Sequence, residues 1–230
     1  MKTYFSTFVT GTQEIIEEIL KKRRDRFKIK LLLDGLMVYA SDYPEREIRN
    51  FRFFNNSFIS VRLFKSLKPN KQSLESMITS VTRNHGLERA LAQYAPPGRK
   101  FFKIVASLEN QTTAIAHTVL RGLESKIMHI NGLRLSIKNP NLEFWFLLRR
   151  EGYGFFGIRI TYPYGAERRP AKGELRKEIS HIMSTLSEPQ PKDIILDPFA
   201  GYGSIPSERG ISFPYQKIFA VEYDNLDSRI

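Results

Sequence analysis

The stretch that decides the fold is Asp193-Ile-Ile-Leu-Asp-Pro-Phe-Ala-Gly-Tyr-Gly-Ser-Ile-Pro-Ser-Glu-Arg209, followed by Lys217-Ile-Phe-Ala-Val-Glu-Tyr-Asp224. One apolar run ends at Asp197, a turn with Gly201 and Gly203 follows, and a second apolar run ends at Glu222. This order predicts a strand, a glycine turn, a short helix and a second parallel strand, which is how a nucleotide-cofactor fold begins. The sequence stops at Ile230, so we expect it to hold only the first strands of that fold.

The turn suits a cofactor that carries ribose or phosphate. Such cofactors lie at the carboxyl end of the first parallel strand, where glycine tolerates positive φ and leaves no Cβ in the way. An acid at the end of the second strand can bind ribose hydroxyls, and Glu222 stands nineteen residues after Gly203. Spacing alone is a weak signal, because the third glycine of the dinucleotide fingerprint and the Gly-Lys-Ser/Thr of a P-loop are absent. An ordinary glycine-rich loop therefore stays open at this point.

The wider sequence around the turn resembles a known enzyme family. Asp197-Pro-Phe-Ala-Gly-Tyr-Gly-Ser-Ile-Pro-Ser-Glu208 is similar to the motif Asp-Pro-x-Cys-Gly-Ser-Gly-Thr-Ile-x-x-Glu of the THUMP-domain RNA methyltransferases. These enzymes use S-adenosylmethionine to make N2-methylguanosine in tRNA or rRNA. Upstream, residues 139–159 look like the end of a THUMP domain, and residues 168–180 look like the connector and first methyltransferase helix. Ala200 and Tyr202 depart from the family's usual cysteine and serine.

The resemblance implies three parts in the chain. Residues 1–66 would form an α+β ferredoxin-like unit, residues 67–162 a THUMP RNA-binding domain, and residues 170–230 the start of an α/β Rossmann-like methyltransferase domain. The residues themselves agree with the first part, since 1–66 reads β-α-β-β-α-β, with a hairpin turn at Asp34-Gly35 and a second helix from about Pro44 to Phe54. The two prolines and the glycine of residues 162–170 mark the best linker.

The resemblance also implies an S-adenosylmethionine site. Its members would be Asp197, Pro198, Phe199, Ala200, Gly201, Gly203, Glu222 and Asp224. Asp197 and the two glycines would line the methionine end of the cofactor, Glu222 would bind the ribose, and Asp224 would approach the adenine. Glu208 stands where the family also has an acid, with a less defined role.

The catalytic residues are not identifiable from this sequence. The family holds the target amine with an Asn/Asp-Pro-Pro-Tyr motif, and these 230 residues contain none. Because methyl transfer to an exocyclic amine depends largely on positioning, we expect this chain by itself to transfer no methyl group.

The net charge of +12 predicts a polyanionic partner. The resemblance makes that partner RNA, with tRNA expected first and rRNA second. The candidate phosphate contacts lie in the THUMP-like part: Lys100, Lys103, Arg121, Arg134, Lys138, Arg149 and Arg150. The denser basic run of residues 21–24 is better interpreted as a solvated helix end, because cations suit a helix C-terminus.

Composition excludes several other classes. The chain has no cysteine, which rules out disulfides, thiol catalysis and cysteine metal sites, and its four histidines lack metal-type spacing, so we predict no metal. No apolar run approaches the roughly 18 residues of a membrane span, so no membrane partner is expected and the cytoplasm is the default compartment.

Two alternatives remain beside the methyltransferase. The first is an RNA-binding module without catalysis, because two parallel strands alone would leave their apolar faces open. The second is the THUMP-bearing thiouridine synthetase group, which is weaker because it needs a different nucleotide loop and usually a catalytic cysteine.

Overall fold

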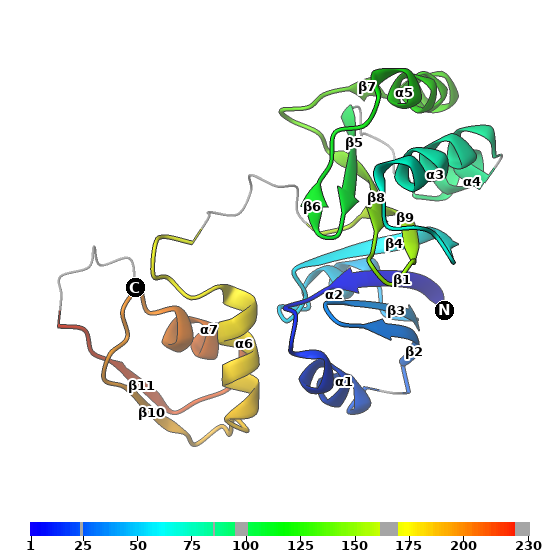
Figure 1. Cartoon of the computed structure of the whole chain (residues 1–230). Coiled ribbons are helices and arrows are strands. Elements are labelled where there is room, and N and C mark those ends of the chain that lie inside the picture. The colour runs from blue at the N-terminus through cyan, green and yellow to red at the C-terminus, as the bar shows by residue number, and fades with distance from the viewer. Residues whose placement is uncertain (24, 85, 95–100, 162–169, 224–230) are drawn as a thin grey trace. The chain divides into compact units, whose positions relative to one another are not determined.

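The computed structural model describes residues 1–23, 25–84, 86–94, 101–161 and 170–223. Contacts divide the chain into two compact units, one of residues 1–5 and 57–166 and the other of residues 6–56 and 167–230. The first strand, β1 (Lys2–Thr7), crosses the boundary between them. Figure 1 labels the elements of both units.

The unit of residues 1–5 and 57–166 is built on a mixed sheet. Its strands follow the order β4 (Asn56–Phe64), β9 (Gly154–Arg159), β8 (Leu142–Leu148), β5 (Phe101–Leu108) and β6 (Gln111–Thr112). Neighbours along this order are antiparallel except β8 and β5, and the short β7 (Arg134–Leu135) also runs parallel to β5. Parallel strands need a crossover, and α5 (His117–Asn131) lies between β5 and β8 in the chain.

Helices pack on this sheet because their apolar residues recur on one face. The helix α3 (Lys71–Arg83) buries Leu74, Met77, Ile78 and Val81, a spacing of three and four residues. It packs against α5, against α4 (Gly86–Tyr94) and against β5 and β8. The side chain of Asn70 accepts a hydrogen bond from the Ser73 N–H at 2.9 Å and thereby caps its first turn.

One glycine of the sheet marks a close approach. A Cβ on Gly157 of β9 would stand 2.4 Å from the ring of Phe5 and 2.6 Å from the carbonyl oxygen of Ile59. Phe5 is itself stacked on Phe58, with ring centroids 4.6 Å apart. The stack therefore occupies the space that a larger residue at position 157 would need.

The unit of residues 6–56 and 167–230 begins with a helix and a hairpin. The helix α1 (Gln13–Lys21) buries Ile16 and Leu20 and packs against β2 (Phe27–Leu33). The strands β2 and β3 (Leu36–Ser41) are antiparallel, joined by the expected Asp34-Gly35 turn in which Gly35 has φ +81°.

The second helix of this segment is shorter than the sequence predicts. The helix α2 covers Glu45–Arg49 only, whereas we expected it to run to about Phe54. Turns replace its second half, with the Phe51 N–H bonded to the Ile48 carbonyl and the Phe54 N–H to the Phe51 carbonyl. This irregular path buries Phe53 and Phe54, which a continued helix would have placed on successive faces.

The C-terminal segment of the same unit forms a β-α-β arrangement after one helix. The elements are α6 (Lys177–Leu186), β10 (Ile194–Asp197), α7 (Ser204–Ser212) and β11 (Lys217–Ala220), and α6 packs on α7. The strands β10 and β11 are parallel, with Asp197 in register with Ala220. Among the described residues, no helix combines the length and apolar character that crossing a membrane requires.

Candidate cofactor site

The site predicted from the sequence lies at the carboxyl ends of β10 and β11. The chain leaves β10 at Asp197, turns through Gly201 and Gly203, runs along α7 and returns in β11 (Figure 1). The Val221 N–H donates to the Asp197 carbonyl at 2.9 Å, and the Ala200 N–H donates to the Val221 carbonyl at 2.8 Å. These bonds hold the glycine turn against the residues that follow the second strand.

Both glycines of the turn have the backbone conformation that motivated the prediction. Gly201 has φ +52° and Gly203 has φ +69°, in the left-handed region that side chains disfavour. The nearest atom to a Cβ built on Gly201 is Oε2 of Glu222 at 3.9 Å. The space that a Cβ would occupy at Gly201 is therefore open except for the Glu222 carboxylate at its edge.

The two acids predicted at the strand ends contact the turn. Oε2 of Glu222 accepts a hydrogen bond from the Gly201 N–H at 2.5 Å, and its Oε1 accepts one from the Tyr223 N–H at 2.9 Å. Oδ1 of Asp197 accepts a hydrogen bond from the Phe199 N–H at 3.2 Å. Glu222 is exposed, so its carboxylate can accept hydroxyl donors from a ligand as well.

The remaining predicted members surround the turn in different ways. Phe199 is 85% exposed and Tyr202 is 40% exposed, so two aromatic rings stand beside the glycines. Pro198 is exposed and Ala200 is half-buried. Asp224 lies outside the described residues. Tyr202, which departs from the family's usual serine, therefore does not close the turn by packing into the protein.

The helix α7 is fixed by two charged residues that follow each other in the chain, Glu208 and Arg209. Arg209 donates to Asp193 at 2.8 Å and to the Pro214 carbonyl at 2.8 Å, which ties α7 to the start of β10 and to the loop before β11. The hydrogen bonds of Asp193, from the Gln190 backbone and from Arg209, lower its pKa.

Glu208 is the centre of a cluster that the sequence did not predict. Its carboxylate is buried and lies within hydrogen-bond distance of Arg52, His181 and Ser212. Burial alone would raise the pKa of Glu208, but the hydrogen bonds with these three side chains lower it to about 2. The only sequence signal was the acid itself, which stands at the family's motif position.

The predicted RNA contacts fall into two groups. Arg121, Arg134, Lys138 and Arg150 are exposed, whereas Lys100 lies outside the described residues. Lys103 pairs with the buried Glu143 at 3.0 Å, and the buried Arg149 donates to Asn110 and lies 3.7 Å from Glu151. Those last two cations therefore have partners within the protein.

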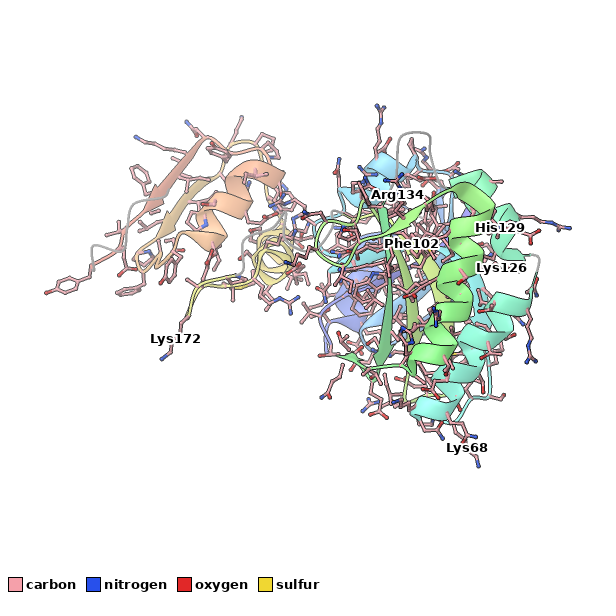
Figure 2. The ribbon with its side chains drawn as sticks, turned by 90° about the horizontal axis from the view of Figure 1, so that it is seen from above. Lys68, Phe102, Lys126, His129, Arg134 and Lys172 are labelled. Atoms are coloured by element: carbon pink, nitrogen blue, oxygen red, sulfur yellow. The ribbon has the colours of Figure 1, made fainter. Side chains whose placement is uncertain are left out.

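Lys126 of α5 also has partners within the protein. Lys126 is labelled in Figure 2. Its Nζ donates to the carbonyl oxygens of Thr82 at 2.8 Å and Asn84 at 3.0 Å, at the C-terminal end of α3. A cation at this position satisfies carbonyl groups that a helix end leaves without partners. Among the described residues, no group of three or more histidine, aspartate or glutamate side chains could hold a metal ion.

Comparison with known proteins connects this geometry to a family. Residues 166–221 match the family model UPF0020, described as the RMKL-like methyltransferase domain. The U6 snRNA (guanine-N(2))-methyltransferase THUMPD2 of Bos taurus is 29% identical over 119 residues, which cover 51% of this chain and 23% of that protein. These matches confirm the resemblance to the THUMP-type RNA methyltransferases.

Solved structures of other proteins share the fold. TrmN from Thermus thermophilus superposes with a TM-score of 0.68 at 16% identity, covering 97% of this chain and 66% of TrmN. SMU.472, in complex with SAH, gives a TM-score of 0.58 at 15% identity, covering 91% of this chain and 55% of that one. A mixed α/β fold of the methyltransferase type is thereby confirmed. The chain spans less than two thirds of the length of each of these three relatives.

Proposed function

We propose that the protein is an S-adenosylmethionine-dependent methyltransferase that acts on guanine N2 in RNA. The observation that carries the proposal is the glycine turn between β10 and α7, closed onto Glu222 at the end of the following strand. The methyltransferase model matches this same segment, and the relatives include an RNA guanine-N2 methyltransferase and a protein solved with SAH.

The residues of the turn fit this cofactor. A Cβ at Gly201 would meet only Oε2 of Glu222, at 3.9 Å, so glycine here leaves room for a ligand beside the backbone. Glu222 offers carboxylate oxygens to the two ribose hydroxyls, and Asp197 offers one beside the turn. The cofactor supplies an electrophilic methyl group on its sulfonium. The chain's own residues bind and orient it, and the rings of Phe199 and Tyr202 offer faces that suit a cation.

The N-terminal residues are proposed to bind the RNA. In this proposal residues 1–66 form the ferredoxin-like unit and residues 67–162 the THUMP domain, with the exposed Arg121, Arg134, Lys138 and Arg150 contacting phosphates. The mixed sheet with α3 and α5 packed together is compatible with a separate binding module. We expect a tRNA substrate in the cytoplasm, while the name of the bovine relative makes U6 snRNA the main competitor.

One observation favours a second candidate, an RNA-binding module without catalysis. Several large apolar side chains of β10, β11 and the residues after them are exposed, among them Ile194, Leu196, Phe219 and Val221. A parallel pair of strands normally has both faces covered. In this candidate, residues 1–165 would hold RNA and the 230 residues would transfer no methyl group.

The deciding experiment compares cofactor binding by the full-length protein and by Gly201→Arg. We expect titration calorimetry to detect S-adenosylmethionine binding by the wild-type protein and none by the variant. The reason is that the introduced side chain would enter the ligand's space and strain the left-handed backbone. Gly173→Arg is the matched control, since Gly173 also has positive φ, with open space around it. Equal affinity in wild type and Gly201→Arg would overturn the cofactor assignment.

The substrate is tested separately. In an intact protein that also supplies the target-amine motif absent from these 230 residues, transfer of a labelled methyl group from the cofactor to tRNA, rRNA and U6 snRNA, followed by nucleoside analysis, should yield N2-methylguanosine in tRNA. The 230 residues alone should transfer none. Label in U6 snRNA alone would correct the substrate, and binding of cofactor and RNA without transfer would favour the second candidate.

A further inference from the structure

Glu208 of α7 receives hydrogen bonds from three parts of the sequence. Nε and Nη2 of Arg52 donate to its two carboxylate oxygens at 2.6 Å and 2.5 Å, which is the bidentate geometry of an arginine–carboxylate pair. Nδ1 of His181 lies 2.9 Å from Oε1, and the Ser212 hydroxyl donates to the same oxygen at 2.6 Å. The carboxylate is only 3% exposed, so its charge depends on these partners.

The segment that supplies Arg52 lies far from α7 in the chain. Arg52 follows α2, and 156 positions separate it from Glu208. Phe53, the next residue, lies beside the His181 ring, with centroids 6.0 Å apart, and His181 stacks on Phe213 at 5.2 Å. A polar pair and an aromatic contact therefore join residues 52–53 to α6 and α7.

Helix α7 connects these contacts with the cofactor turn. It begins at Ser204, directly after Gly203, and the Ser207 N–H donates to the Gly203 carbonyl at 2.9 Å. In its first turn the N–H groups of Ser204 and Ile205 have no acceptor within the helix and can serve a ligand at the turn, whereas Pro206 has no N–H. Arg209 holds the helix to β10, and Glu208, one residue earlier, holds it to Arg52. The orientation of those N–H donors therefore depends on both anchors.

We propose that Arg52 is a positioning residue for the cofactor turn, acting through Glu208 on α7. This inference rests on the proposed function, because it assumes that the turn binds S-adenosylmethionine. It makes the segment after α2 part of the scaffold of the cofactor site, although that segment contains none of the residues that would touch the cofactor.

The test measures cofactor affinity in the full-length protein and in Arg52→Gln and Arg52→Lys. We expect Arg52→Gln to weaken S-adenosylmethionine binding about tenfold. Arg52→Lys keeps the charge but cannot make the bidentate pair with Glu208, so we expect it to bind with intermediate affinity. Amide hydrogen exchange of residues 203–208 should become faster in both variants, while that of the β2–β3 hairpin stays unchanged. Arg26→Gln is the matched control, because Arg26 is a half-buried arginine that also pairs with a carboxylate, that of Asp42 at 3.1 Å.

A double variant separates positioning from general loss of stability. If Arg52 acts through Glu208, then Arg52→Gln combined with Glu208→Gln should bind the cofactor no more weakly than Glu208→Gln alone. Additive losses, or wild-type affinity and exchange in Arg52→Gln, would overturn the inference. If Arg52→Gln does not fold, wild-type affinity and exchange in Arg52→Lys would overturn it equally. Absence of binding by the wild-type protein would instead refute the proposed function.

Discussion

The Gly201 N–H donates to the carboxylate of Glu222, which stands 21 residues later in the chain. This bond joins the turn after the first parallel strand to the acid after the second. The same carboxylate also accepts from the Tyr223 N–H, so backbone groups on both sides orient it. An acid oriented in this way presents its remaining lone pairs in a fixed direction.

Removing that acid should weaken cofactor binding without unfolding the protein. We expect Glu222→Ala to lower affinity for S-adenosylmethionine by about 10- to 100-fold, the equivalent of the roughly 1.5–3 kcal/mol that a hydrogen bond to a charged group contributes. Titration calorimetry measures the change. Glu18→Ala, which removes an exposed glutamate of α1, serves as the control. An unchanged affinity in Glu222→Ala would remove the ribose role from Glu222.

The buried Glu208 should make stability depend on acid pH. Its pKa of about 2 lies below the ordinary 4.5, so the folded protein binds its proton less readily than the unfolded chain. The resulting stabilisation is fully present above about pH 4.5 and is lost as pH falls toward 2; it amounts to about 3 kcal/mol. Urea unfolding between pH 3 and pH 7 should show a smaller pH dependence in Glu208→Gln than in wild type. Parallel pH profiles for the two proteins would contradict the assignment.

The close approach at Gly157 leads to a prediction about the mixed sheet. We expect Gly157→Ala to lower the free energy of unfolding by about 2 kcal/mol or more, since the new methyl group would overlap the Phe5 ring and the Ile59 carbonyl. Thermal and urea unfolding measure the change. Gly122→Ala in α5 is the matched control. There the methyl group would meet only Thr82 at 3.8 Å, and alanine favours a helix over glycine by about 1 kcal/mol. Equal stability of Gly157→Ala and wild type would show that the stacked rings of Phe5 and Phe58 can move aside for the methyl group.

The glycine turn could be predicted from the sequence because its causes are local. Positive φ at Gly201 and Gly203 and the acid after the next strand follow from residue types and spacing within one β-α-β unit. The short α2 could not be predicted in the same way. The local sequence pattern allowed the helix to continue to Phe54. In the structure the chain forms turns after Arg49 instead, and these turns bury both Phe53 and Phe54.

The charged residues show why the rest of the site could not be predicted from the sequence. Lys103 is in register with Glu143 across the parallel strands β5 and β8, so it pairs with a buried carboxylate. Without that register the sequence offers only an isolated cation, which we interpreted as a phosphate contact. The Arg52–Glu208 pair depends in the same way on tertiary packing between distant segments. The roles of the predicted cofactor and RNA residues, and the domain boundaries, stay predictions.

The exposed cations near β7 provide the test of RNA binding. We expect Arg134→Ala combined with Lys138→Ala to weaken binding of tRNA and to make the slope of log affinity against log salt shallower by about 1.5, since each lost phosphate contact removes roughly 0.7 to 0.9. Fluorescence anisotropy at several salt concentrations measures both quantities. The control is Lys21→Ala combined with Lys22→Ala, which removes the same charge from the end of α1, where a helix-end role is expected. If the control pair changed the slope and the β7 pair did not, the RNA surface would have to be moved to the N-terminal segment.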